Sequence, residues 1–213
     1  MRVLDLFAGL GGWSAAFKDR GHEVLTLDND SRFDVDIHVD ILKWQTSTLI
    51  WQPDVILASP PCESFSVLNI GKNWTRPTDI PADAPKTESA RMGLALVNRT
   101  VEVIKELKPK FFVIENPRAK LRKLQPLRFY DRRTVTYCQY GLTTMKPTDL
   151  WGGFPSSLEL KPPCKAGMPC HVAAPSGSNT PGSIMGMKDK AERAKIPYEL
   201  SLAICLAAEV DLQ

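Results

Sequence analysis

Two short apolar runs that each end in reactive residues constrain the fold of this chain most strongly. The run 54–58 leads into Ser59-Pro60-Pro61-Cys62, and the run 111–114 leads into Glu115-Asn116-Pro117. Parallel strands of an open α/β sheet end on a common edge, where ligands bind. We therefore expect the cysteine and the glutamate to face one pocket. A thiolate nucleophile would stand there beside a carboxyl group that can hold a proton, as attack on an electron-poor ring requires.

The order of the periodic segments predicts an α/β fold with a doubly wound, mostly parallel sheet. Apolar or alternating runs predict strands over 2–6, 23–27, 35–39, 54–58, 111–114 and 133–137, and helical periodicity predicts helices over 13–20, 88–107 and 198–210. Residues 63–87 are predicted to be loop. Residues 142–195 are rich in Gly, Pro and Ser and show no convincing periodic element. We therefore expect a catalytic and cofactor-binding domain over 1–141, a small target-recognition segment over 142–195, and a C-terminal helix over 196–213 that returns to the catalytic domain.

The bulk properties narrow the class of protein. No apolar run approaches the roughly 18 residues of a membrane span, so no membrane partner is expected. The N-terminus enters a strand at once, which argues against a signal peptide. Five cysteines, an odd number, fit a reducing compartment better than a disulfide framework, and we expect a cytoplasmic protein. The net charge of +3 does not by itself indicate a nucleic-acid partner.

Positive charge is concentrated directly after the Glu115 segment. Seven bases lie between positions 118 and 133: Arg118, Lys120, Arg122, Lys123, Arg128, Arg132 and Arg133. Such a run is often only a solvated face. Its position beside a reactive segment favours a rim that binds phosphates.

The first strand-to-helix turn is predicted to hold a cofactor. Phe7 to Gly12 is rich in glycine, which lets a ligand approach the backbone, and the following helix N-terminus favours a carboxylate or phosphate. Asp28 ends the second predicted strand, where an acid can accept from ribose hydroxyls, and Asp40 could reach an adenine edge. The alternative is that Asp28, Asn29 and Asp30 only form a turn.

Cys62 and Glu115 could also have purely structural roles. A free cysteine such as Cys62 is most often a buried structural thiol. Two preceding prolines and the following Ser64-Phe65-Ser66 instead indicate a stiff strand exit that presents the next side chain. Glu115 could be a capping or salt-bridged acid, but an acid that ends a Phe-Phe-Val-Ile strand is costly without a partner.

Together these segments resemble the C5-cytosine methyltransferase family. The resemblance rests on Asp5 to Gly12, on Asp28 and Asp40, on Pro60-Pro61-Cys62, on Glu115-Asn116-Pro117, and on the segment from Pro197 to Glu209. The short chain looks most like the compact phage and prophage members, which implies the cytoplasm of a bacterial host. The resemblance implies double-stranded DNA as partner and S-adenosylmethionine as cofactor. The implied cofactor-binding residues are Phe7, Ala8, Gly9, Leu10, Gly11, Asp28, Asn29, Asp40, Ile41 and Pro60.

The resemblance also implies a mechanism for methyl transfer. The target cytosine is flipped out of the helix, and Cys62 attacks C6 as a thiolate. Glu115 bonds the ring edge while C5 takes the methyl group, and loss of the C5 proton then releases Cys62. The chain departs from the family pattern at Glu63, where the family has a glutamine, and at Asp131 to Val135, where its arginine-rich segment is reduced. Arg133 is the arginine expected to help hold the base.

Three thiols and an imidazole lie outside the common core of the family. Cys164, Cys170 and His171, with Cys138 upstream, offer a ligand set for one structural zinc ion. The alternative is three unlinked thiols and a surface histidine. A segment poor in core residues would gain from a metal.

Two further functions remain open on the sequence alone. One is an RNA cytosine-C5 methyltransferase, because a branch that methylates tRNA shares these motifs. The other is a catalytically silent module that binds cofactor and DNA, against which the intact Cys62 and Glu115 argue. A methyltransferase acting on adenine N6 or cytosine N4 is disfavoured, because those families resemble Asp-Pro-Pro-Tyr at the pocket. No obligate protein partner is expected.

Overall fold

A seven-stranded sheet forms the centre of the computed structural model, which describes residues 1–67, 69–165, 167–172 and 193–213. Its strands are β1 (Arg2–Leu6), β2 (Glu23–Asp28), β3 (Ile37–His38), β4 (Val55–Ala58), β5 (Phe111–Pro117), β6 (Asp131–Thr136) and β7 (Pro147–Gly153). The helices are α1 (Ala15–Asp19), α2 (Ile70–Asn73), α3 (Glu88–Leu107) and α5 (Tyr198–Asp211). Short 3-10 turns are η1 (Thr46–Thr48), η2 (Lys120–Lys123), η3 (Gln125–Leu127) and η4 (Tyr137–Tyr140).

The strand order is β3-β2-β1-β4-β5-β7-β6. Strands β3, β2, β1, β4 and β5 are parallel, and β7 pairs antiparallel with both β5 and β6. After β1, the strands β2 and β3 are added on one side of it, and the chain then crosses to β4 on the other side of β1. The predicted doubly wound α/β sheet is therefore confirmed, and the change of direction between β1 and β4 is where such folds bind ligands.

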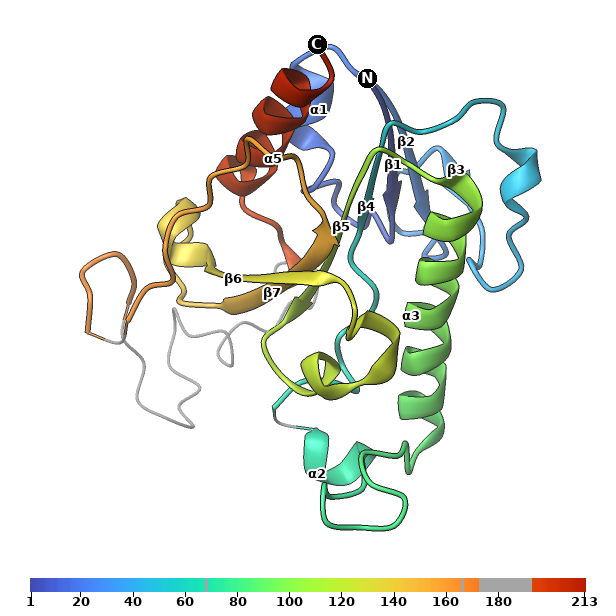
Figure 1. Cartoon of the computed structure of the whole chain (residues 1–213), viewed down its shortest axis with the longest axis vertical. Coiled ribbons are helices and arrows are strands. Elements are labelled where there is room, and N and C mark those ends of the chain that lie inside the picture. Colours follow the sequence, from blue (N-terminus) through green and yellow to red (C-terminus); the bar gives the residue numbers. More distant parts are fainter. Residues whose placement is uncertain (68, 166, 173–192) are drawn as a thin grey trace.

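Helices cover both faces of the sheet (Figure 1). The helix α3 packs its apolar stripe, including Val97 and Ile104, against Leu4 and Ile56 on one face. On the other face α1 and α5 lie side by side over the residues that alternate with these, such as Val3. Because successive strand side chains point to opposite faces, two hydrophobic cores form on one continuous sheet. No helix in the described part of the chain is long and apolar enough to cross a membrane.

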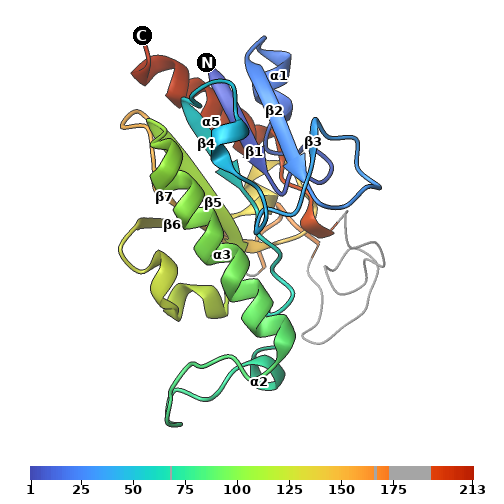
Figure 2. The same cartoon turned by 90° about the vertical axis from the view of Figure 1, so that its right-hand side faces the viewer.

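The long helix α3 matches its predicted bounds, 88–107. Its N-cap Thr87 accepts a hydrogen bond from the Ala90 N–H at 3.2 Å, and Lys108 ends it in the left-handed conformation before Pro109. Figure 2 looks onto this helix, which begins at the end of the molecule that carries α2 and runs over the sheet toward the end that carries the two termini.

One expectation about the C-terminal third of the chain is wrong. Residues 147–153, predicted to hold no periodic element, form β7 in the sheet between β5 and β6. The strand was hidden because Thr148, Asp149, Leu150 and Trp151 are all buried, so the run shows no alternation of polar and apolar residues. The sheet therefore extends past the expected domain boundary at 141, and residues 173–192 of the expected recognition segment lie outside the described residues.

Candidate active site

Four parallel strands deliver the expected site residues to one edge of the sheet. Phe7 follows β1, Asp28 ends β2, the Ser59 to Cys62 segment follows β4, and Glu115 lies near the end of β5. The amino ends of these strands lie near the two termini, so this edge faces the opposite end of the molecule (Figure 1). The sheet thus places the predicted nucleophile in the loop that follows β4 and the predicted acid on the adjacent strand β5.

The loop that carries Cys62 is held by a hydrogen bond from β5 and by hydrogen bonds within its own turn. The Asn116 side chain on β5 donates from Nδ2 to the Pro60 carbonyl at 2.9 Å, and this contact is buried. The Cys62 carbonyl accepts from the backbone N–H groups of Phe65 and Ser66, each at 3.0 Å, which closes a tight turn. The strand that holds Glu115 therefore also sets the position of the thiol.

Trp74 and the helix α3 both pack against the loop that carries Cys62. The Trp74 indole donates to the Ser64 carbonyl at 2.8 Å, and its ring stacks on Phe65. A Cβ on Gly93 of α3 would lie 2.5 Å from Ser64 Oγ and 3.3 Å from the Phe65 ring. An alanine at position 93 would therefore force Ser64 Oγ or the loop to move, so the glycine allows the helix to approach the loop this closely.

Glu115 is buried between a phenol and an ammonium group. The Tyr137 hydroxyl donates to Glu115 Oε1 at 2.8 Å, and Lys146 Nζ lies 3.8 Å from the same oxygen. The ammonium also lies 4.6 Å from the centre of the Tyr137 ring and donates to the Arg193 carbonyl at 3.1 Å. Burial, and then the charge of Glu115, raise the pKa of Tyr137 well above its usual value, so the phenol stays a donor.

Burial, Glu115 and Lys146 together set the ionisation of Cys62. Burial raises the pKa of the thiol, and the negative charge of Glu115 raises it further, while the Lys146 ammonium lowers it. Since the thiolate is the nucleophile, Lys146 favours the reactive form of Cys62. Sequence reasoning missed both Tyr137 and Lys146. The end of the predicted strand 133–137 was a signal for the tyrosine, and no periodic pattern surrounded the lysine.

Arg133, the arginine expected to hold the base, is bound elsewhere. Its guanidinium donates to Asp131 at 3.2 Å and to the Leu158 carbonyl at 3.1 Å, and lies 4.5 Å from the Phe154 ring centre. The reason is topological, because β7 is inserted between β5 and the outer strand β6 that carries Arg133. The cation that the structure places beside Glu115 is Lys146.

The predicted cofactor turn has the backbone that close approach of a ligand requires. Gly9 and Gly11 adopt left-handed φ angles of 52° and 72°, and Phe7 adopts 60°. Asp28 holds this turn with both oxygens, which accept from the backbone N–H of Gly9 and of Asp30 at 2.9 Å each. A carboxylate has about four acceptor sites, so Asp28 retains capacity for ribose hydroxyls.

The remaining expected cofactor residues differ in exposure. Ile41, Ala8 and Pro60 are buried, whereas Leu10 and Asn29 are exposed. Asp40 accepts from the Leu42 N–H at 3.0 Å and remains partly accessible. Glu63, where the sequence departs from the family pattern, is exposed immediately after Cys62.

Asp5, on β1 just before the turn, differs from Asp28 and Glu115 because its buried carboxyl oxygens have no hydrogen-bond partner among the described residues. Its carboxyl group is fully buried. Burial raises its pKa from 3.8 to about 7. Asp5 is therefore largely neutral in the folded protein below that pH.

The basic stretch is only partly exposed, so two of its seven bases, Lys120 and Arg122, do not belong to the expected rim that binds phosphates. Lys120 is buried, with its ammonium paired with Asp83 and lying over Trp74. Arg122 donates to both oxygens of the buried Asp149 at 2.9 and 2.7 Å. These two cations stabilise the fold, and the exposed members of the stretch are Arg118, Lys123, Arg128 and Arg132.

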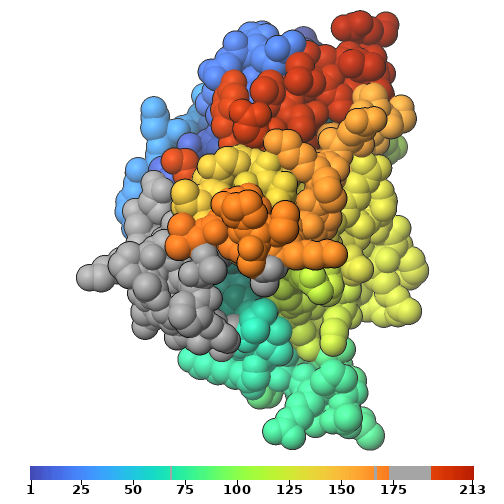
Figure 3. All heavy atoms as spheres, turned by 90° about the vertical axis from the view of Figure 1, so that its left-hand side faces the viewer, coloured from blue at the N-terminus to red at the C-terminus, as the bar shows by residue number. Residues whose placement is uncertain are grey.

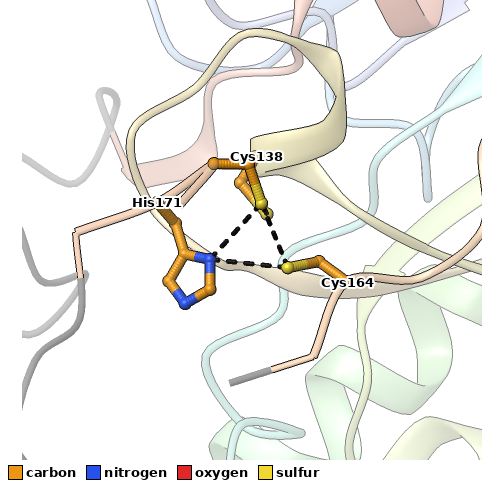
Figure 4. Close-up of side chains that lie close together, drawn as sticks. Cys138, Cys164 and His171 are labelled. Carbon is orange, nitrogen blue, oxygen red and sulfur yellow. Dashed lines mark hydrogen bonds between the residues drawn. The ribbon is translucent and has the colours of Figure 1, made fainter. Parts of the chain in front are cut away.

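The four expected zinc ligands lie together, away from Cys62. The ligand atoms of Cys138, Cys164, Cys170 and His171 are all within 4.8 Å of one another. Figure 4 shows three of them, Cys138, Cys164 and His171, pointing toward a common centre.

Comparison with known proteins places these residues in a family context. A family model described as C-5 cytosine-specific DNA methylase matches residues 1–124. The chain is 33% identical over 176 residues to a frog virus 3 (isolate Goorha) protein named "Probable DNA (cytosine-5)-methyltransferase", covering 77% of this chain and 78% of that one. It is also 28% identical over 141 residues to the type II methyltransferase M.HgiGI of Herpetosiphon aurantiacus, covering 58% of this chain and 97% of that one.

Other similarities cover a smaller share of the matched protein. The type II methyltransferase M1.HphI of Haemophilus parahaemolyticus is 28% identical over 133 residues, which span 54% of this chain and 32% of that protein. Among solved structures, the methyltransferase EhMeth of Entamoeba histolytica superimposes with a TM-score of 0.52 at 14% identity, over 76% of this chain and 55% of that one. At this identity the superposition shows a shared fold.

Proposed function

The chain belongs to the C-5 cytosine-specific DNA methylase family, and we propose that Cys62 and Glu115 carry its reaction on a cytosine of double-stranded DNA. The frog virus 3 relative is named a probable DNA (cytosine-5)-methyltransferase and the other relatives type II methyltransferases, so the chain is an enzyme of this kind. The observation that carries the assignment of residues is the buried Asn116–Pro60 contact at 2.9 Å, which fixes the Cys62 loop to the strand of Glu115.

Cys62 is the proposed nucleophile. Its thiolate forms a bond to C6 of the flipped cytosine, which makes the ring electron-rich at C5. C5 then takes a methyl group, the C5 proton is lost to a base, and the C6–sulfur bond breaks to release the thiolate. The Lys146 ammonium favours the thiolate before attack, because it opposes the effects of burial and of Glu115 on the pKa of Cys62.

Glu115 is the proposed group that binds the ring edge at N3 and the exocyclic amine. Tyr137 and Lys146 hold the carboxyl group through contacts to Oε1, which fixes its orientation before the base arrives. Held in this orientation, the carboxyl group in its protonated form can donate to N3 and accept from the exocyclic amine, with little reorientation as negative charge develops on the ring. Tyr137 and Lys146 are thus positioning residues, and Lys146 replaces Arg133 as the cation proposed beside the base pocket.

S-adenosylmethionine, when bound, supplies an electrophilic methyl group. The residues present fit it: a turn with two left-handed glycines leaves room at the carboxyl edge, and Asp28 lies at the end of the next strand. We propose that the turn, Asp28 and Asp40 hold the methionine, ribose and adenine parts respectively. The bond changes at cytosine need no metal ion, so the thiol cluster near Cys138 has another role.

The proposed compartment is the cytoplasm of a bacterial cell. All five cysteines are free thiols in the structure, and proteins keep exposed thiols reduced most readily inside the cell. Cellular DNA is also accessible there.

Bisulfite sequencing tests the proposed function most directly. DNA from cells that express the chain should carry C5-methylcytosine in a defined sequence context, and DNA from cells that express Cys62→Ala should not. In vitro, a duplex with 5-fluorocytosine at the target site should trap a covalent adduct with the wild-type protein only. Full methylation by Cys62→Ala would overturn the assignment, and methylation of RNA alone would overturn the choice of DNA.

A further inference from the structure

Four ligand-type atoms from two separate parts of the chain converge beside η4. Cys138 lies in η4, and Cys164, Cys170 and His171 come from a segment that follows β7. Cys170 Sγ lies 3.7 Å from Cys138 Sγ and 3.1 Å from Cys164 Sγ. His171 Nδ1 lies 3.4 Å from Cys164 Sγ and 3.6 Å from Cys170 Sγ. Figure 3 shows the segment around 160–172 lying over the segment around 135–145 on the surface.

These distances match the edges of a tetrahedral coordination shell. With Zn–S of about 2.3 Å and Zn–N of about 2.0–2.1 Å, an ideal site separates two sulfurs by about 3.8 Å and a sulfur from a nitrogen by about 3.5 Å. Three of the four distances agree closely, and the Cys164–Cys170 distance is shorter. A disulfide needs about 2.05 Å, so 3.1 Å is not one. We propose that Cys138, Cys164, Cys170 and His171 bind one zinc ion in a closed, four-coordinate site.

Neighbouring groups support these ligands. The Gln139 side-chain amide donates to Cys170 Sγ at 3.3 Å, and such donors offset the charge of a thiolate. The Cys164 backbone N–H donates to Thr136 Oγ1 at 2.7 Å, which fixes this ligand against the end of β6. His171 presents Nδ1 to the cluster, which leaves its Nε2 to carry the ring proton. Three thiolates and one imidazole leave no open position, so the role is structural.

The proposed ion would fasten a segment that is held by a few hydrogen bonds and buries few apolar side chains. Residues 161–163 are exposed, as are Lys165, Met168 and Val172, so burial of apolar side chains contributes little there. Backbone contacts such as Val172 N–H to the Thr143 carbonyl at 2.9 Å add to the attachment. Tyr137, which holds Glu115, is the chain neighbour of Cys138. The ion therefore also supports the position of this tyrosine.

The metal content of purified protein tests the proposal independently of methyl transfer. Protein expressed with zinc and dialysed should contain about one zinc per chain. Cys164→Ser and Cys170→Ser should each retain less than about a fifth of that amount. Cys62→Ala is the matched control, since it removes a thiol outside the cluster, and it should retain the zinc in full while losing methyl transfer.

Cobalt replacement keeps the test valid where the serine variants fail to fold. Wild-type protein exchanged with Co²⁺ should show the intense visible bands of tetrahedral cobalt and the near-ultraviolet sulfur-to-cobalt charge transfer, and zinc should displace both. Protein with no bound zinc and no tetrahedral cobalt spectrum would overturn the proposal, as would a Cys164–Cys170 disulfide found by mass spectrometry without reduction. Zinc retained in both serine variants would show adventitious binding and would overturn it as well.

Discussion

Lys146 is the residue whose charge acts on both proposed catalytic side chains, Cys62 and Glu115. Its ammonium lies 3.8 Å from Glu115 Oε1 and lowers the pKa of the Cys62 thiol. Lys146→Met should therefore raise the pKa of Cys62 and displace the pH dependence of adduct formation to higher pH. At neutral pH the rate should fall about tenfold for each pH unit by which the pKa of the thiol rises, because the thiolate fraction falls by that factor.

Single-turnover trapping with 5-fluorocytosine DNA over a range of pH measures this displacement. Lys146→Arg, which keeps the charge, is the control and should leave the profile near that of the wild type. A uniform loss of rate in Lys146→Met, with no displacement of the profile, would show that the lysine only supports the fold.

Asp5 predicts a pH dependence of stability. Its pKa is raised from 3.8 to about 7 in the folded protein, so the stability that the neutral carboxyl contributes is complete below pH 3.8 and is lost as the pH rises through about 7. Asp5→Asn cannot ionise and should not show this loss. The difference in unfolding free energy between variant and wild type should grow by on the order of 2 kcal/mol from pH 5 to pH 8.

Urea denaturation of both proteins at the two pH values provides the comparison. The buried amide of the variant has its own cost, but that cost is the same at both pH values, so only the change in the difference is informative. An equal difference at pH 5 and pH 8 would mean that Asp5 is ionised in the folded state.

At the scale of elements, α3 lies close to the loop that carries Cys62 because the residue at the contact is Gly93, which has no side chain. An alanine at position 93 would gain about 1 kcal/mol of helix propensity. Its Cβ, however, would meet Ser64 Oγ at 2.5 Å, and such overpacking typically costs about 1–3 kcal/mol. Gly93→Ala should therefore displace the loop and lower turnover more than it lowers cofactor affinity.

Two comparisons make this test specific. Gly71→Ala in α2 is the control, because its Cβ would meet nothing within 4 Å. Ser64 Oγ has no hydrogen-bond partner among the described residues, so Ser64→Ala should restore part of the turnover of Gly93→Ala by removing the clashing atom. Equal turnover in Gly93→Ala and Gly71→Ala would contradict the proposed support of the loop.

At the scale of the whole molecule, the exposed cations near the carboxyl edge are expected to contact DNA phosphates. Arg118 follows β5 directly, and Lys123 is exposed at the end of η2. Reversing both charges to glutamate should weaken DNA binding and reduce the salt dependence of the binding constant by about one unit of slope for each lost phosphate contact.

Lys105 and Lys110 form the matched control, since they are exposed near the opposite edge of the sheet and give the same change in net charge. Fluorescence anisotropy with duplex DNA over a salt series measures the slopes. The same slope in both double variants would show that only the net charge of the protein affects DNA binding, not phosphate contacts by Arg118 and Lys123. Lys120 and Arg122 are unsuitable for this test, because removing one member of a buried ion pair costs about 3–5 kcal/mol of stability.

Much of the fold, and the placement of Cys62 and Glu115 at one edge of the sheet, could be predicted from the sequence because both depend on local patterns. Apolar runs predicted β1, β2, β4 and β5, and helical periodicity predicted α3 to its ends. Since parallel strands end on one edge, the residues after those runs had to share it. The proposed roles of Cys62 and Glu115 follow from that rule, and the turn before α1 follows from its glycines.

The tertiary structure decided what depends on strand order and on pairing between distant residues. The strand β7 has no alternating pattern, because it is buried on both faces, and its insertion beside β5 brings Lys146 to Glu115 and leaves Arg133 on the outer strand. Lys120 and Arg122 resembled surface charges until Asp83 and Asp149 were placed beside them. Such pairs join residues far apart in sequence, so no local pattern records them, and only the folded chain determines which charges remain free for a substrate.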